Sequence, residues 1–444
     1  MKLWDKGTKV NSSIDNFTVG KDRQLDLSLA RHDIVGSIAH CIMLESIGLL
    51  TADELADIKR ELIYIHKVSQ IGMLLIDDGV EDIHSQIEIM LTKKLGDVGK
   101  KIHNGRSRND QVLLDLKLFV REEIYTITSL TNDLFKIFIE KSETFKNILM
   151  PGYTHLQVAM PSSFGLWFGA YAESLTDDMQ LMLAAYKIAN QNPLGSAAGY
   201  GSSFPLNRQL TTELLGFDNL NYNVVYAQMG RGKLEKTVAF AMASIAATIA
   251  KFAADAALYM SQNFNFIALP DEFTTGSSIM PHKKNPDVFE LLRGKCNKLQ
   301  SLPYEFLIIT NNLTSGYFRD LQTVKEGFIP AFESLKECLV VLKLVLSSIK
   351  IRENILDDEK YKYLFTVEEL NKKVLKGMPF RDAYREMGRE IAEGKFKPEK
   401  NVHHTHEGSM GNLMNKEIIS KMDSILYEFN FEKAEAAISK LLKI

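Results

Sequence analysis

Two long stretches without glycine or proline constrain the fold of this chain more than any other feature of its sequence. One covers residues 107–147 and the other residues 233–269. In the first stretch apolar residues recur every three or four positions, which is the spacing of one face of an α-helix. At 1.5 Å per residue this stretch predicts a rod of roughly 60 Å. Helices this long and this apolar need helical partners along their whole length, so we predict an all-α fold with a long central helical bundle.

Shorter helical patterns surround these stretches. The middle of the chain predicts further helices at about 162–189, 287–311 and 331–349, and the start predicts shorter ones at about 30–45 and 52–67. The two ends therefore differ from the middle, and we predict three domains. They are an N-terminal helical domain over 1–105, a central helical bundle over 106–355 and a C-terminal small helical domain over 356–444.

Charge and hydropathy exclude several classes of protein. The chain has 53 basic and 56 acidic residues, a net charge of −3, which gives no electrostatic basis for binding nucleic acid or an anionic membrane. The most apolar window, 237–250, is shorter than the ~20 residues that cross a bilayer, so we interpret it as a core helix. The N-terminal segment lacks the apolar stretch of a signal peptide, and the three cysteines match no metal-ligand pattern. These observations predict a cytoplasmic protein with reduced thiols.

The segment GSSIMPHKKNP, residues 276–286, lies between two of the expected helices. Its prolines, glycine and paired serines make a helix there implausible, and composition alone favours an ordinary connection. The alternative is a functional loop. Two serines, a histidine, two lysines and an asparagine stand together just before a helix N-terminus, where oxyanions and carboxylates bind.

This segment resembles the signature of the fumarase/aspartase superfamily at every fixed position. The resemblance implies a helical homotetramer that catalyses an anti β-elimination and releases fumarate or a close relative. It also implies that sequence blocks from three different subunits meet at each of four active sites. The expected partners are therefore a small-molecule substrate and further copies of the chain. The signature indicates the type of reaction but not the substrate.

Five further blocks, in order along the chain, resemble the argininosuccinate lyases. They are EDIHSQIE (81–88), KIHNGRSRNDQV (101–112), PGYTHLQVAMP (151–161), GYFRDLQ (316–322) and KGMPFRDAY (376–384). The resemblance implies cleavage of argininosuccinate to arginine and fumarate in arginine biosynthesis. It implies no organic cofactor and no metal, because the protein's own hydrogen-bond donors can stabilise the charge that develops.

The resemblance assigns catalytic roles to four residues. Ser277 is the base that removes the proton next to a carboxylate, and Lys283, with Asn285, stabilises the doubly charged carboxylate that results. His155, paired with Glu290, is the acid–base partner that protonates the departing guanidinium nitrogen. A free serine hydroxyl is far too weak a base. Ser277 must therefore be ionised by neighbouring cations and amide dipoles when the loop closes and excludes water.

The resemblance also assigns substrate contacts, although each residue has a plainer interpretation. Ser107, Arg108 and Asn109 form a helix-capping sequence that can equally hold substrate carboxylates. The other candidates are, by composition alone, polar turns or helix surfaces. The complete set of expected substrate-binding residues is Thr18, Asp82, His84, Ser107, Arg108, Asn109, Thr154, Asn285, Tyr317, Gln322 and Lys325.

The chain departs from the family pattern in the stretch AQMGRGKLE, residues 227–235. Only Arg231 of the charged residues usual there is present. This loss motivates the hypothesis that the substrate is an argininosuccinate acylated on its α-amine. The alternative from another class is a catalytically silent structural protein on the same fold, as the lens crystallins related to this family are.

Overall fold

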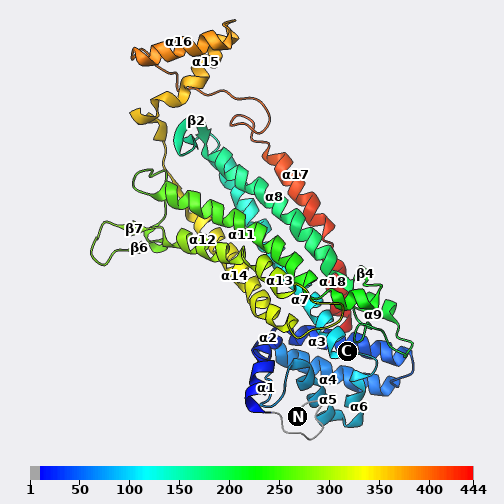
Figure 1. Ribbon diagram of the computed structural model, residues 1–444. Coiled ribbons are helices and arrows are strands. Elements are labelled where there is room, and N and C mark those ends of the chain that lie inside the picture. The colour runs from blue at the N-terminus through cyan, green and yellow to red at the C-terminus, as the bar shows by residue number, and fades with distance from the viewer. Residues whose placement is uncertain (1–10, 444) are drawn as a thin grey trace.

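The computed structural model describes residues 11–443, and residues 1–10 and 444 lie outside this range. Figure 1 shows an elongated bundle of long helices, with the shorter N-terminal helices gathered at one end of it. The strands of the described chain form only small two-stranded sheets. The predicted all-α class with a long central bundle is therefore confirmed.

Six helices make up the bundle, and four of them are long. They are α7 (Arg108–Thr144), α8 (Phe164–Ala189), α11 (Lys233–Met260), α12 (Asp287–Leu299), α13 (Leu302–Ile309) and α14 (Leu321–Ser348). Aromatic side chains join the helices at their centre. Phe138 of α7 packs edge-on against Phe252 of α11, and stacks on Tyr171 of α8. Burial of these large rings contributes much of the apolar driving force for the bundle.

Three predicted helix boundaries are wrong. Helix α11 ends at Met260, because the chain then turns and pairs β5 (Ile267–Ala268) with β8 (Lys350–Ile351). The pattern at 287–311 is broken between α12 and α13, where Pro303 occupies the first turn, in which no helical N–H is needed. Helix α14 begins earlier than predicted and continues through Pro330.

The N-terminal helices enclose a second apolar core. Its buried side chains come mainly from α3 (Ala30–Ser46), α4 (Ala52–Gln70) and α5 (Ile83–Leu95), which α1 (Ser12–Val19) and α2 (Asp22–Asp26) precede in the chain. Leu114 and Leu118 of α7 belong to this core, whereas the rest of α7 packs in the bundle. Helix α7 is thus one rod shared by both cores. It positions its N-terminal residues against the N-terminal helices.

The C-terminal helices pack in two different places. Helices α15 (Thr366–Leu375) and α16 (Phe380–Ala392) form a unit with its own small core and project from one end of the bundle (Figure 1). Helices α17 (Asn415–Glu428) and α18 (Phe431–Leu441) return along the body, where Leu441 joins the N-terminal core. The division into three domains stays a prediction.

Within residues 11–443, α11 is the one helix long and apolar enough to cross a membrane by length and composition. Of its apolar window, 61 % is buried inside the structure. This burial agrees with the interpretation of residues 237–250 as part of a core helix.

Candidate active site

A small polar cavity lies where α2, α5, α7 and the start of α14 meet, and we call it the polar pocket. Seven of the predicted site residues line it. They are Asp82, His84, Arg108, Asn109, Tyr317, Gln322 and Lys325. The structure thus brings together residues that are far apart in the sequence. A larger cavity of about 500 Å³ lies between α3, α4, α7 and α18, but none of the predicted residues lines it.

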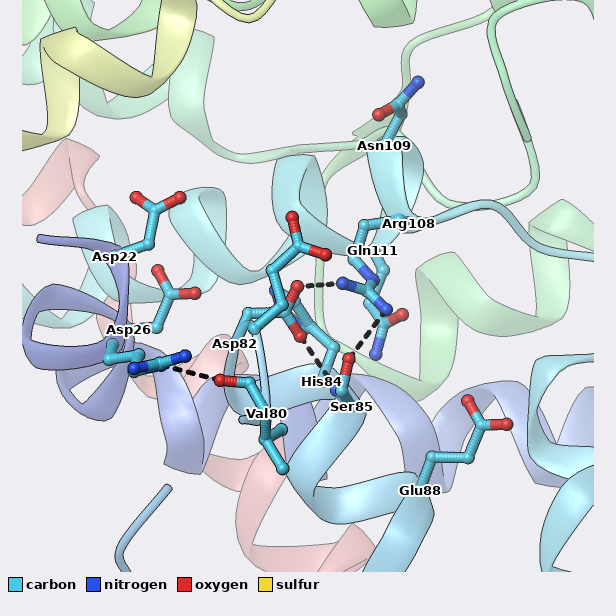
Figure 2. Close-up of polar contacts among 12 residues, drawn as sticks. Asp22, Asp26, Val80, Asp82, His84, Ser85, Glu88, Arg108, Asn109 and Gln111 are labelled. Atoms are coloured by element: carbon cyan, nitrogen blue, oxygen red, sulfur yellow. Dashed lines mark hydrogen bonds and ion pairs between the residues drawn. The ribbon is translucent and has the colours of Figure 1, made fainter. Parts of the chain in front are cut away.

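The start of α7 supplies the first polar contacts of the pocket. Ser107 caps the helix, and its hydroxyl accepts the N–H of Asn109 at 3.3 Å. The guanidinium of Arg108 binds the carboxylate of Asp82 and donates to the hydroxyl of Ser85 at 3.0 Å (Figure 2). Asp82 itself caps α5. The capping interpretation of Ser107 is therefore confirmed, and the same turn presents Arg108 and Asn109 to the pocket.

Lys325 lies buried between two carboxylates that the sequence analysis did not single out. Its ammonium is 2.7 Å from Asp22 and 2.8 Å from Asp26, and only 3 % of its side chain is exposed. Burial raises the pKa of Asp22, while Lys325 opposes the rise. Two carboxyl groups therefore hold the one ammonium in place at this wall of the pocket.

His84 lines the polar pocket and lies between two buried carboxylates. Its Nδ1 is 3.0 Å from Asp33 of α3 and 3.3 Å from Asp115 of α7. Burial alone would lower the pKa of His84, but Asp33 and Asp115 outweigh it, so the pKa is raised. Nε2 has no hydrogen-bond partner among the described residues. The ring therefore retains one free nitrogen.

Thr154 and His155 lie at the tip of a β-hairpin that was not predicted. Strand β1 (Leu149–Thr154) pairs antiparallel with β2 (Gln157–Ser163), and Thr154 pairs with Gln157. The two residues between the strands have φ of 54° and 58°, as in the tight turns that join hairpins. Residues other than glycine rarely adopt this positive-φ conformation, and such backbone strain is often found at functional sites. Both Thr154 and His155 are exposed.

The segment 276–286 forms a loop, as predicted, pinned by a minimal hairpin. Strand β6 (Thr275–Gly276) pairs with β7 (Lys284–Asn285). At its tip the hydroxyl oxygen of Ser277 accepts the N–H groups of Ile279 at 3.3 Å and Met280 at 3.1 Å. Two amide dipoles therefore point at this oxygen. Lys283 and Glu290 are exposed, the latter in the first turn of α12.

The predicted residues thus form three separate groups within one chain. Figure 1 shows the N-terminal helices at one end of the bundle, β2 near the other end, and the β6–β7 loop at a third place. Neither the hairpin residues nor the loop residues line the polar pocket. Thr18 of α1 does not line it either. Its carbonyl accepts from Arg319 at 2.8 Å, close to the start of α14.

Several residues at the pocket went unrecognised in the sequence. Asp22 and Asp26 line it, and Asp33 and Asp115 hold His84. A signal existed for Asp115, since a lone carboxylate inside the apolar run 112–120 indicates a buried acid with a specific partner. Arg231 of the unusual stretch also lines the pocket, although its guanidinium binds Glu235 at 3.0 Å.

Comparison with known proteins shows the family of the chain. A family model described as lyase matches residues 8–300. The chain is 64 % identical over 441 residues to an argininosuccinate lyase of Parabacteroides distasonis, covering 99 % of both chains. It is 63 % identical to one of Bacteroides fragilis, again with 99 % of both chains covered. A third, from Thermotoga neapolitana, is 38 % identical over 86 % of this chain and 96 % of its own.

Solved structures agree on the fold. An EDDS lyase with bound fumarate matches with a TM-score of 0.75 at 21 % identity, over 98 % of this chain and 94 % of that one. A class II fumarase from Schistosoma mansoni matches with a TM-score of 0.70 at 14 % identity, over 93 % and 95 %. At these identities the likeness extends to the fold alone.

Proposed function

The chain belongs to the argininosuccinate lyase family, and from this membership we propose how its residues divide the reaction among them. It is a carbon–nitrogen lyase that cleaves argininosuccinate to arginine and fumarate. The catalytic loop is the β6–β7 loop. The observation that carries its assignment is the hydroxyl oxygen of Ser277, at which two backbone N–H groups point.

Ser277 acts as the base for the proton next to the carboxylate. Oriented amide dipoles stabilise negative charge on oxygen, which is what an ionised serine requires. Lys283 and Asn285 follow in the same loop and neutralise the second charge that forms on the carboxylate when the proton leaves. Loop closure over the substrate would bring these groups together and exclude water.

His155 protonates the guanidinium nitrogen that departs. Glu290 is its proposed carboxylate partner, since a carboxylate on one ring nitrogen orients the other. Among the described residues of the same chain, neither side chain makes a hydrogen bond or an ion pair, and both are exposed. This geometry supports a pairing between different subunits.

The polar pocket holds the substrate. We assign its carboxylate end to Ser107, Arg108, Asn109 and His84, with Asp82 orienting Arg108. Tyr317, Gln322 and Lys325 contact the arginine-like end, and Thr18 and Thr154 add hydroxyl contacts. In Figure 2 the side chain of Asn109 points away from the Asp82–Arg108 pair.

We propose that the active sites are shared between the subunits of a homotetramer in the cytoplasm. The three separated groups support this proposal. The polar pocket of one chain measures only about 30 Å³, whereas ligand pockets usually have about 300–1,000 Å³. Large apolar side chains on the bundle also lie exposed in the single chain, among them Phe240, Leu291, Ile308 and Leu344. Such a surface is typical of subunit interfaces.

A mixing experiment tests the shared site. Ser277→Ala and His155→Asn are each expected to be inactive alone. If one site takes its loop and its hairpin from different subunits, random 1:1 tetramers contain both intact groups at about a quarter of sites. Co-expression should therefore restore about a quarter of wild-type activity, measured as fumarate absorbance. Tetramers of both variants that stay inactive would show that each site belongs to one subunit.

A substrate comparison tests the alternative of an acylated substrate. We expect argininosuccinate to give the higher kcat/KM, since the argininosuccinate lyases at 63–64 % identity span the whole chain. Arg231 belongs to the unusual stretch 227–235 that motivated the acylated-substrate alternative, and it lines the polar pocket. Faster release of fumarate from α-N-acylated argininosuccinate would favour the alternative. No fumarate from either compound would favour a silent protein.

A further inference from the structure

The two carboxylates that hold His84 are not equivalent. All three side chains are buried, with 2 % of His84 and 1 % of each aspartate exposed. Oδ1 of Asp33 accepts hydrogen bonds from Nδ1 of His84 and from the side-chain amide of Gln111, while its Oδ2 has no partner among the described residues. Asp115 lies 3.3 Å from Nδ1, but neither of its oxygens has a hydrogen-bond partner among the described residues.

This difference in hydrogen bonding divides the protons between the two acids. A buried ionised carboxylate without donors is costly, so Asp115 is the acid that keeps its proton. Burial and the neighbouring charge of Asp33 raise the pKa of Asp115 well above its usual range. Burial alone would raise the pKa of Asp33 too, but His84 and Gln111 lower it. Asp33 is thus the ionised partner.

An ionised Asp33 beside His84 stabilises the doubly protonated ring. The Nδ1 proton is then donated to Asp33, and the Nε2 proton has no acceptor within the described chain. His84 also lines the polar pocket. A buried N–H without a partner is destabilising, and a carboxylate bound in the pocket would remove this cost.

We propose that Asp33 is a positioning residue that keeps His84 as an imidazolium and directs its free Nε2–H to a substrate carboxylate in the polar pocket. This proposal rests on the function given above. In this proposal Asp115 is a neutral acid that packs beside the His84 ring. A cationic donor binds a carboxylate more strongly than a neutral one, and most strongly once that carboxylate gains a second charge.

Other charged groups face this cluster from the surrounding elements, and their effects on its pKa values differ in sign. Asp26 of α2 also raises the pKa of His84, whereas Arg106 lowers the pKa of both Asp33 and Asp115. Beyond these, His84 is near His103, whose own pKa burial and Arg106 lower, and Glu88 is near Asp33. Asp33, the nearest ionised group, therefore has the largest effect of any charged group on the protonation of the ring.

The test compares Asp33→Asn with Asp115→Asn, the same change on two sides of one imidazole. Wild-type cleavage of argininosuccinate is measured first, so that a failure of the proposed function is seen separately. In Asp33→Asn we expect kcat/KM to fall about 10- to 100-fold at neutral pH, which corresponds to one charge-assisted hydrogen bond. The decline of kcat/KM with rising pH should also move to lower pH in this variant, because His84 loses its proton more readily. Asp115→Asn should lose much less and keep the wild-type pH profile.

Three results would overturn the proposal. They are equal losses in both variants, an unshifted pH profile in Asp33→Asn, and loss of wild-type activity after chelation, which would indicate a metal held by the cluster. If Asp33→Asn does not assemble, ¹³C-ε1 histidine labelling of the wild-type protein gives the answer instead. The His84 resonance, assigned by its absence in His84→Gln, should report a protonated ring at neutral pH. A neutral ring there refutes the proposal.

Discussion

Replacing Ser277 with alanine lowers kcat for argininosuccinate cleavage about 10³-fold and changes KM by no more than a few-fold. A general base accounts for roughly 10²- to 10⁴-fold of a rate, and the loss falls on kcat because the base acts in the transition state. The two backbone N–H groups that now face the hydroxyl would remain, but without an oxygen to ionise. Steady-state kinetics by fumarate absorbance give both constants.

Ser278→Ala is the matched control for this prediction. It removes the same group one position along the same exposed loop. We expect its kcat to stay within a few-fold of wild type, so that any effect of altered loop mobility is measured separately. A Ser277→Ala enzyme with the full rate would refute the assignment of the base, and equal losses in both variants would indicate a structural role.

Replacing Lys325 with methionine should affect stability and activity together. The ammonium is the nearest cation to both Asp22 and Asp26, and removing one member of a buried ionic group costs about 3 to 5 kcal/mol of unfolding free energy. Without the ammonium, the burial that already raises the pKa of Asp22 would no longer be opposed by Lys325, so stability should recover as the pH falls and this carboxyl takes up a proton. Loss of the substrate contact should lower kcat/KM about 10²- to 10³-fold.

A triple variant separates the two effects. Adding Asp22→Asn and Asp26→Asn removes the repulsion that Lys325→Met creates, and should return most of the lost thermal stability. Activity should stay low, because the cation itself is still missing. Recovery of both properties would mean that Lys325 serves the fold alone, and thermal unfolding with kinetics on the same preparations decides between these outcomes.

Local sequence patterns predicted the parts of the structure that local physics determines. Periodicity found α7 and the core helix α11, and the capping sequence placed the start of α7 correctly at Ser107. The proline-rich and glycine-containing segment 276–286 was predicted as a loop and is one. Each of these features depends on residues close together in the chain.

Features that depend on distant contacts were missed. The hairpin tip at His155 needs two non-glycine residues with positive φ, which no local preference indicates. Asp33 and Asp115 are single acids in helices, and only the packing of α3 against α7 makes them partners of His84. The same holds for Asp22 and Asp26, whose partner Lys325 lies about three hundred positions further on.

One consequence of helix α7 concerns which changes evolution can accept. Its first residues line the polar pocket, and the rest of its 37 residues is locked into two cores. Deleting or inserting a single residue in it would rotate everything beyond that point by about 100° and shift it by about 1.5 Å. The buried faces on one side would then point to solvent. Related enzymes should therefore exchange side chains on the exposed positions of this helix while preserving its length, and insertions should accumulate in the connections instead.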